Sequence, residues 1–165
     1  MDKQAQDYRL SADQIIKKYG MKSHPEGGHF RETYRCRNKA NERNLSTAIY
    51  FLLKGGEKSH FHRIKSDEIW HFYLGGPLKI VEIDLEGKIK ETILGKNILK
   101  DQLLQYTVPA GHWFASTPLE GTSFSFVGCT VAPGFDFQDF ELAKSSDLEA
   151  KYPDHTAVIR ELCLP

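Results

Sequence analysis

Short strand-like segments separated by turns fill the middle of the chain, and they constrain the fold more than any other feature. Between Phe30 and Val131, apolar residues recur in brief runs or at alternate positions, as in strands with one or both faces buried. Turn-forming residues such as those at Glu86-Gly87 separate the runs. Many short strands at this spacing predict an all-β antiparallel barrel or jelly roll. The predicted strands cover residues 30–36, 46–53, 59–64, 68–74, 78–85, 88–94, 103–108, 112–116 and 122–131.

Helical segments flank the predicted barrel on both sides. Ser11 can cap a first helix, with Gln14 completing a capping box and Gly20 ending the helix. In the tail, Asp136 can cap a helix that contains the next aromatic residues, and Asp154 can cap a last helix. Each helix has an apolar stripe, so we expect them to cover the outside of the barrel.

The length and charge of the chain limit the number of domains and the kinds of partner that we expect. Its 165 residues suit a single domain over residues 1–165, with a barrel core at about 28–131 and a helical tail at about 136–163. Lys and Arg number 22, as do Asp and Glu, so the net charge gives no reason to expect a nucleic-acid partner. No run approaches the roughly 20 apolar residues that cross a bilayer, so we expect no membrane partner.

The first residues and the cysteines both bear on where in the cell the protein is found. The segment from Met1 to Asp7 is polar and has no apolar core of a secretory signal. Cys36, Cys129 and Cys163 are odd in number and far apart, which favours neither a disulfide framework nor a zinc ribbon. We therefore expect a cytoplasmic protein.

Two histidines on one predicted strand are the first candidate site. Alternation puts His60 and His62 on the same face, about 6–7 Å apart, and Glu68 begins the next strand. Two imidazoles and a carboxylate can hold a divalent metal ion such as Mn, Fe, Ni or Zn. The alternative is a pair of surface histidines beside a turn, with no metal.

A carboxylate in the first strand is the second candidate. Glu32 shares a face with Phe30, Tyr34 and Cys36, while Arg35 lies on the other face. An inward Glu32 would be a buried carboxylate, and burial raises a carboxyl pKa toward values that suit an acid or base. The alternative is a salt bridge between Glu32 and an arginine that closes the end of the barrel.

The alternation of side chains along a strand also assigns the other aromatic and titratable residues to the inner or the outer face. Trp70 and Phe72 share the face of Glu68 and are expected to line the cavity or the core, whereas His71 faces away. His112 and Phe114 share a face in a later strand and are further candidates for binding a ligand. Cys129, in the middle of a strand, is expected to be a small buried side chain rather than a nucleophile.

The residues around the histidine pair resemble the first motif of the cupin superfamily, which runs from glycine through His-x-His and glutamate to a closing glycine. His60, His62 and Glu68 match this motif, and Gly75 closes it, although the gap before Glu68 is longer than usual. Pro109-Ala110-Gly111 resembles the start of the second motif, but Phe114 stands where cupins place their last histidine.

Longer phrases resemble one uncharacterised branch of that superfamily, often called cupin-5. The resemblance implies a cupin-type antiparallel jelly-roll barrel with a ligand cavity, assembled as a homodimer, and it implies no established reaction. The matching phrases cover residues 24–35, 46–53, 59–73, 109–116 and 128–135.

A weaker resemblance concerns the opening phrase, in which Gly28, Phe30 and Glu32 follow the pattern Gly-x-Phe-x-Glu of cupin-fold sugar-nucleotide epimerases. It implies metal-free chemistry, with His62 as base and with Tyr50 or Tyr73 as acid. Three functions therefore stay open for a small-molecule ligand in the barrel. They are a metal-dependent enzyme, a metal-free isomerase or epimerase, and a non-catalytic binding module.

Overall fold

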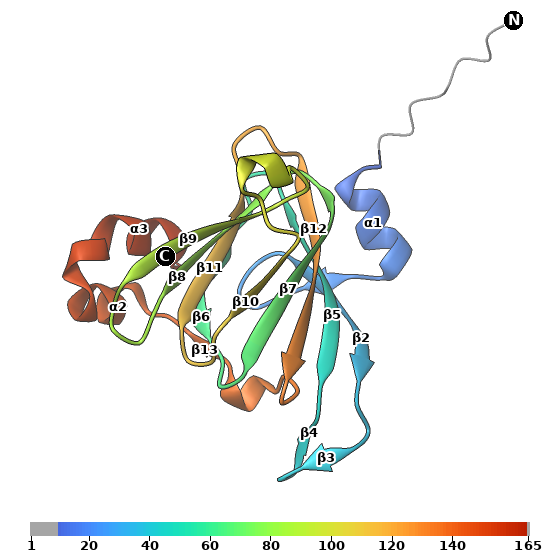
Figure 1. Ribbon diagram of the computed structural model, residues 1–165, viewed down its shortest axis with the longest axis horizontal. Helices are drawn as coiled ribbons and strands as arrows, with labels where there is room; N and C mark the ends of the chain where they lie inside the picture. Colours follow the sequence, from blue (N-terminus) through green and yellow to red (C-terminus); the bar gives the residue numbers. More distant parts are fainter. Residues whose placement is uncertain (1–9, 165) are drawn as a thin grey trace, which may run out of the picture.

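Two antiparallel sheets face each other and form a jelly-roll barrel in the computed structural model, which describes residues 10–164 (Figure 1). The six-stranded sheet has the order β1 (Lys22–Ser23), β2 (His29–Arg35), β5 (Thr47–Lys54), β12 (Phe124–Ala132), β7 (Asp67–Gly75) and β10 (Gln105–Val108). The five-stranded sheet has the order β13 (Glu141–Leu142), β6 (Ser59–Arg63), β11 (Trp113–Pro118), β8 (Leu78–Ile83) and β9 (Ile89–Leu94).

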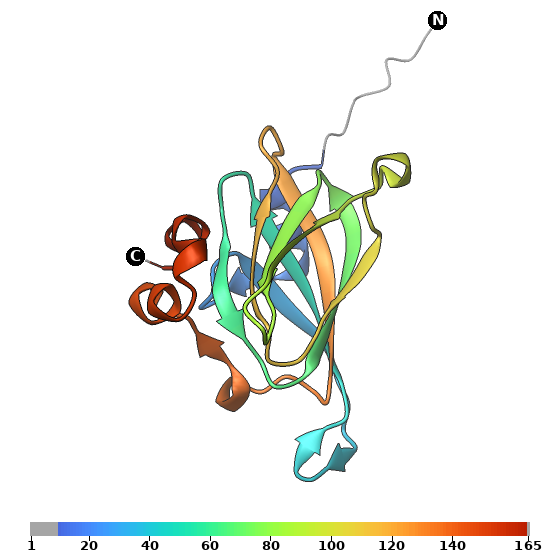
Figure 2. The same cartoon turned by 60° about the vertical axis from the view of Figure 1, so that its left-hand side comes forward.

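The remaining elements lie around this barrel (Figure 2). A small hairpin of β3 (Lys39–Ala40) and β4 (Arg43–Asn44) projects from one end. The helices are α1 (Ala12–Tyr19), α2 (Ser145–Lys151) and α3 (Thr156–Leu162), with 3-10 turns at Ile98–Lys100, Phe137–Asp139 and Pro153–His155. The all-β antiparallel barrel with helices at both ends of the chain, as predicted from the strand spacing, is confirmed.

The central strand β12 sets the side chains of the large sheet in rows. Val131 pairs with Thr47 of β5 on one side and with Glu68 of β7 on the other. Two residues along, Cys129 pairs with Trp70. Because side chains alternate along a strand, these residues all point into the barrel. The prediction that Trp70 faces inward with Glu68 is confirmed, since Trp70 is fully buried in the core between the sheets.

A bulge in β2 corrects one predicted face. The register of β2 against β5 shifts between Glu32 and Tyr34, so that Glu32 pairs with Ile49 and Arg35 pairs with Thr47. Both partners point inward, and so Arg35 follows Glu32 on the inner face while Tyr34 is 54% exposed. The predicted assignment of Tyr34 to the inner face and Arg35 to the outer face is wrong, because an extra residue reverses the alternation.

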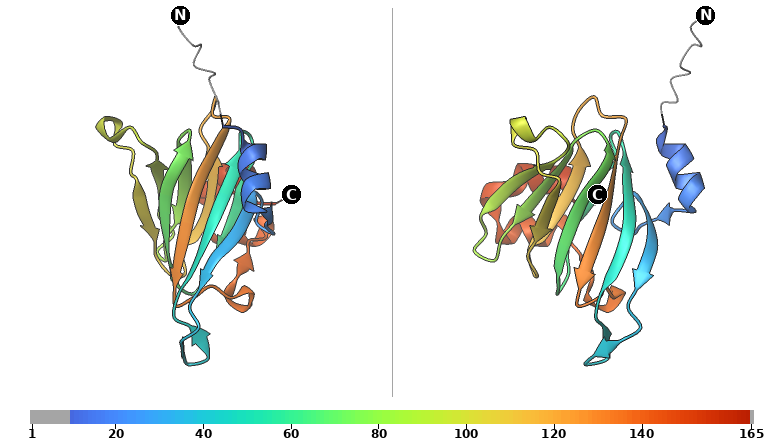
Figure 3. Two further views of the ribbon diagram at one scale, coloured as in Figure 1. Left: turned by 90° about the vertical axis from the view of Figure 1, so that its right-hand side faces the viewer. Right: turned by 45° about the vertical axis from the view of Figure 1, so that its right-hand side comes forward.

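The first helix covers the outer face of the large sheet (Figure 3). Ser11 and Gln14 form the expected capping box, and Gly20 ends α1 in the left-handed conformation at φ 58°. Ile15 is buried against Leu52 of β5. The strand β5 is therefore apolar on both faces because the barrel interior covers one face and α1 covers the other.

The tail covers the outer face of the small sheet. Leu148 of α2 and Ile159 of α3 pack on Phe61 of β6, as expected of helices with an apolar stripe. The predicted helix after Asp136 is wrong: Asp136 accepts a hydrogen bond from the backbone of Gln138, but only a 3-10 turn and the short strand β13 follow. Within residues 10–164, every helix is too short or too polar to cross a membrane.

The attachment of α1 is testable with a single truncation. We expect Ile15→Ala to lower the free energy of unfolding by about 2–5 kcal/mol, because Ile15 is 2% exposed and leaves a cavity under the helix. Lys18→Ala, on the exposed side of the same helix, should change it by less than about 0.5 kcal/mol. Denaturant titration of both variants measures the difference, and an equal loss would show that α1 is not packed as described.

Candidate functional site

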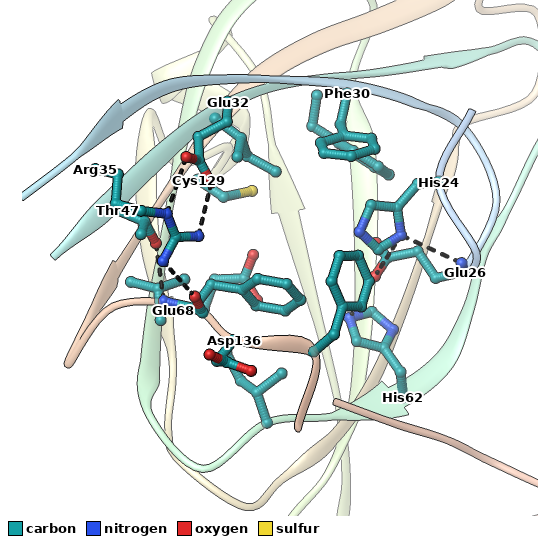
Figure 4. A pocket seen from close by; sticks show the side chains of 16 residues that line it. His24, Glu26, Phe30, Glu32, Arg35, Thr47, His62, Glu68, Cys129 and Asp136 are labelled. Carbon is teal, nitrogen blue, oxygen red and sulfur yellow. Dashed lines mark hydrogen bonds and ion pairs between the residues drawn. The ribbon is translucent and has the colours of Figure 1, made fainter. Parts of the chain in front are cut away.

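A cavity of about 230 Å³ lies inside the barrel at the end that the core side chains leave unfilled (Figure 4). The inner face of the large sheet, the small sheet, the loop between β1 and β2, and the chain after β12 all contribute to its wall. The lining residues are His24, Glu26, Phe30, Glu32, Arg35, Thr47, Ile49, Phe51, His62, Ile64, Glu68, Cys129, Val131, Phe135, Asp136 and Phe137.

The loop between β1 and β2 enters the barrel because it docks on β6. The carbonyl oxygen of Glu26 accepts two hydrogen bonds from His60, one from the backbone nitrogen and one from the ring nitrogen Nδ1, both at 2.7 Å. The next residue, Gly27, has φ 107°, and a Cβ atom there would lie 2.0 Å from the carbonyl oxygen of Lys58. Only glycine permits this approach, which is why the Gly27-Gly28 pair follows Glu26.

The docked loop places the Glu26 carboxyl in a network of buried side chains. One oxygen accepts a hydrogen bond from Ser59 Oγ at 2.8 Å, and the other lies 3.1 Å from His62 Nε2 and 3.4 Å from His24 Nδ1. Burial and the nearby Glu68 raise the pKa of Glu26 well above its usual range. Both effects favour the neutral acid form of Glu26.

The tautomer of His62 follows from its hydrogen bonds. Its Nδ1 donates to the backbone carbonyl of His60 at 2.7 Å, so Nε2 carries no proton and accepts one from Glu26. Burial lowers the pKa of His62 to about 3 and that of His24 to about 4. The contact between Glu26 and His62 is thus a hydrogen bond between a neutral carboxyl and a neutral imidazole.

Glu68 faces this pair from the other sheet, at the start of β7. Burial raises the pKa of Glu68 to about 7, and a hydrogen bond from the Cys129 thiol opposes the rise. Burial first, and then Glu68, raises the pKa of that thiol well above its usual range, so Cys129 is a donor and not a nucleophile. Two buried carboxyls in one small cavity thus have different environments, which is typical of acid and base pairs.

Glu32 and Arg35 form the mouth of the cavity on the side away from His24 and His62 (Figure 4). The guanidinium of Arg35 holds both Glu32 oxygens, at 3.0 and 2.8 Å. Glu32 is exposed rather than buried, and it forms a salt bridge with an arginine, as the predicted alternative described. The bulge in β2 makes this pair possible, because it turns Arg35 to the face of Glu32.

The chain after β12 closes this end of the barrel. The backbone nitrogen of Phe135 donates to Thr47 Oγ1 at 2.9 Å, and its carbonyl oxygen accepts from Arg35 at 3.0 Å. These bonds hold Phe135 and Phe137 over the cavity. In the same region the ring of Phe135 lies 5.0 Å from that of Phe137.

The sequence-predicted site residues divide into three groups. His62, Glu68 and Glu32 line the cavity. Trp70 and Phe114 fill the core beside it, with Phe72 packed against them, and His112 lies 3.3 Å from Glu82 elsewhere in the barrel. The outer face of the large sheet holds Tyr50 and Tyr73, 6.0 Å apart and next to Phe126. The tyrosines cannot reach a ligand in the cavity, because their side chains lie on the outer face of the sheet. On β5 the inward positions beside Tyr50 belong to Ile49 and Phe51.

The predicted metal ligands do not fit a metal ion in this structure. His60 turns its ring to the carbonyl of Glu26 and is not among the lining residues. The Nε2 atom of His62 faces the carboxyl of Glu26, and Phe114 packs its ring 4.1 Å from the His62 ring. Within residues 10–164, no group of three His, Cys, Asp or Glu side chains is arranged to hold a metal.

Sequence reasoning missed His24 and Glu26, which it did not name among the candidate site residues. The available signal was the Gly27-Gly28 pair beside two titratable residues, because adjacent glycines allow a loop to approach other backbone closely. It also missed Arg35 as a lining residue, for which alternation gave no signal because the bulge is invisible in the pattern.

Comparison with known proteins finds a family and several solved structures. The family model described as Cupin superfamily (DUF985) matches residues 13–143. A crystal structure of protein SO0799 from Shewanella oneidensis is 42% identical, with a TM-score of 0.90 over 94% of this chain and 99% of that one. A hypothetical protein from Leishmania major is 35% identical, with a TM-score of 0.89 over 94% and 100% of the two chains.

Two further matches add little about activity. The uncharacterised protein YML079W of Saccharomyces cerevisiae is 29% identical over 156 residues, which cover 83% of this chain and 77% of the yeast protein. Oxalate decarboxylase from Bacillus subtilis is 16% identical with a TM-score of 0.57, and this chain covers 38% of its length. That likeness shows the fold alone.

The buried groups predict how stability depends on pH. A raised carboxyl pKa gives stability that is lost as pH rises from about 4.5 through the folded value, which is about 7 for Glu68. The lowered values of His24 and His62 act in the opposite sense, since stability is lost as pH falls below about 6.5. The two effects oppose each other between about pH 4.5 and 6.5, and only the carboxyls act above that range.

We therefore expect Glu68→Gln to gain stability relative to the unchanged protein as pH rises from 5 to 8.5. The gain should reach roughly 2 kcal/mol, which is several degrees in melting temperature. Glu91→Gln, at an exposed glutamate of β9, is the matched control and should show no such gain. Thermal melts of the three proteins at both pH values measure it, and a constant difference would mean that Glu68 titrates normally.

Proposed function

Because the chain belongs to the cupin superfamily (DUF985), we propose that it binds a small molecule inside the barrel and moves a proton on that molecule. The observation that carries the proposal is the Glu26–His62 pair, which shares one cavity with the second buried carboxyl Glu68. Buried titratable groups cost a fold stability unless hydrogen bonds or charge partners compensate, and groups with strongly shifted pKa values cluster at functional sites.

The pair can work as a proton relay. When Glu26 takes a proton from the ligand, its own proton passes to His62 Nε2, which already faces it at 3.1 Å. The electrons of the broken bond stay on the ligand, which becomes an enolate if the proton leaves a carbon next to a carbonyl group. Return of the proton to a neighbouring atom then gives an isomer.

Glu68 supplies the charge that this relay needs. The protonated His62 would be a buried cation, whose formation its surroundings oppose, since burial lowers its pKa to about 3. An ionised Glu68 in the same cavity offsets that positive charge, and preorganised charges of this kind are often the largest part of catalysis. The reaction class supported best is an isomerase or epimerase acting on a sugar-like or carbonyl compound.

No step of this proposal passes through a metal ion, because the rings of His60 and His62 are already engaged by Glu26. A metal-dependent enzyme and a non-catalytic binding module are the other predicted functions, and the following experiment separates them from a relay.

Deuterium uptake from solvent tests the relay without knowledge of the product. The protein is incubated in D2O with a panel of aldoses, ketoses, amino sugars and nucleotide sugars, and NMR follows the loss of each C–H signal next to a carbonyl. We expect at least one compound to exchange, and we expect Glu26→Gln to slow that exchange by 100-fold or more, since an amide keeps the hydrogen bond but carries no acidic proton.

His71→Gln is the control, because His71 lies on the outer face and bonds to Thr130 and Gln105. Its exchange rate should match that of the unchanged protein, and added EDTA should leave the rate unchanged. Loss of exchange with EDTA would support the metal-dependent enzyme, and exchange in no compound would support the binding module.

The pH profile of the exchange has a defined direction. Glu68 must be ionised to offset the charge on His62, so the rate should rise with pH through about 7, the pKa of Glu68. Glu68→Gln should lower the rate and remove this rise. A profile that falls through pH 7 would contradict the role given to Glu68.

We also propose that the protein assembles as a homodimer through the outer face of the large sheet. This face leaves Tyr34, Tyr73 and Leu74 each about half exposed, and exposed apolar groups on a sheet face favour a partner. Sedimentation should give twice the chain mass of 18.8 kDa at micromolar concentration, and Tyr73→Glu should give the monomer. A monomeric unchanged protein would contradict this assembly.

A reducing compartment such as the cytoplasm fits the same site. Cys129 acts on Glu68 as a thiol donor, and Cys36, Cys129 and Cys163 are all free. We therefore propose that the protein works where thiols stay reduced.

A further inference from the structure

The cavity holds far more acidic than basic side chains. Glu26, Glu32, Glu68 and Asp136 are lining carboxyls, whereas Arg35 alone among the described lining residues has a permanent positive charge. The two lining histidines are neutral at pH 7, as argued above. A cavity of this composition has no group ready to neutralise an ionised carboxyl in its interior.

The charge of Arg35 is already used at the mouth. Its Nε and Nη2 atoms donate to Glu32, and its Nη1 atom donates to Asn44 Oδ1 and to the carbonyl oxygen of Phe135, each at 3.0 Å. A guanidinium whose N–H groups already donate to a carboxylate has few free donors for an incoming anion. Arg35 therefore holds the wall together and is not available as an anion site.

Glu68 is a buried carboxyl that has no countercharge among residues 10–164. It is 8% exposed and lines the cavity, and among residues 10–164 its donor is the thiol of Cys129, a weak one. No arginine or lysine in that part of the chain pairs with it. A buried carboxyl aimed into a cavity with so little support favours a ligand that brings positive charge.

Aromatic rings line the same cavity as that carboxyl. Phe30, Phe51, Phe135 and Phe137 all line the same cavity. The faces of such rings attract a cation, and the attraction strengthens where water is excluded. Rings also bury the apolar body of a small ligand, so carboxyl and rings together select for one molecule with a charged end and an apolar or ring-shaped body.

We propose that the ligand of this cavity carries a cationic nitrogen, a protonated amine or amidine, whose N–H groups donate to Glu68 while its ring-like body packs on the phenylalanines. This inference rests on the small-molecule site proposed above and names its substrate class. The ligand's amine would sit at Glu68, on the large sheet, while the contact between Glu26 on the loop and His62 on the small sheet stays in place. A carbonyl compound with an amino group, such as an amino sugar or an amino ketone, meets both requirements.

Three probes of one shape test the charge that the cavity selects. Benzylammonium, benzyl alcohol and benzoate share a phenyl ring and differ in the charge of a short substituent. Binding is measured at pH 8, where Glu68 is ionised, by titration calorimetry and by NMR. Magnetisation transfer from the probe ring to Phe51 and Val131 shows that the probe occupies this cavity.

We expect benzylammonium to bind at least tenfold more tightly than benzyl alcohol, and benzoate to bind least. Glu68→Gln should remove the preference for benzylammonium, whereas the exposed control Glu91→Gln should keep it. If Glu68→Gln does not fold, the order of the three probes on the unchanged protein is sufficient by itself. Equal affinities, or tightest binding of benzoate, would overturn the proposal.

The probe-binding experiment and the deuterium-exchange experiment can fail independently of each other. Exchange that depends on Glu26, combined with no preference for benzylammonium, would overturn the cationic substrate and leave the relay standing. A clear preference without exchange in any compound would leave a binding site for organic cations and overturn the relay.

Discussion

The carbonyl oxygen of Glu26 accepts two hydrogen bonds from His60, and the cavity depends on this contact. It fixes the loop between β1 and β2 against β6, so that the carboxyl of Glu26 reaches His62 at 3.1 Å. It also occupies the ring of His60, which is the reason that this histidine supports the wall and does not line it. Without the docked loop, the barrel would be open at this end and Glu26 would be in water, with an ordinary carboxyl pKa.

The second constraint is the register of the large sheet. Central β12 pairs with β5 and β7 without a break from Val127 to Val131, and this sets Glu68 and Cys129 in adjacent inward rows. The bulge in β2 then adds Arg35 to the row of Thr47. One extra residue at the sheet edge thus gives the ion pair with Glu32 and the hydrogen bond to Phe135, and these two contacts close the mouth.

Particular residues show what the sequence could predict and what it could not. Alternation correctly placed Trp70 inside and His71 outside, because β7 is regular there. It failed at Tyr34 and Arg35, since a bulge depends on pairing with a neighbouring strand and leaves no mark in local periodicity. The role of Glu26 was out of reach for a similar reason: the loop reaches the cavity through contacts with a strand more than thirty residues away in the chain.

The buried carboxyls of the cavity lower the stability of the fold, and this loss indicates that they serve a function. An apolar side chain in place of Glu68 would avoid the burial of a carboxyl, and cores gain stability from such replacements. The fold instead keeps two buried carboxyls within one cavity, and among residues 10–164 it gives one of them only a thiol as donor. A positive charge on the ligand would supply the countercharge that Glu68 lacks. Binding energy would then come from the missing countercharge of Glu68, and the same ionised carboxyl accounts for the loss of stability expected as pH rises through about 7.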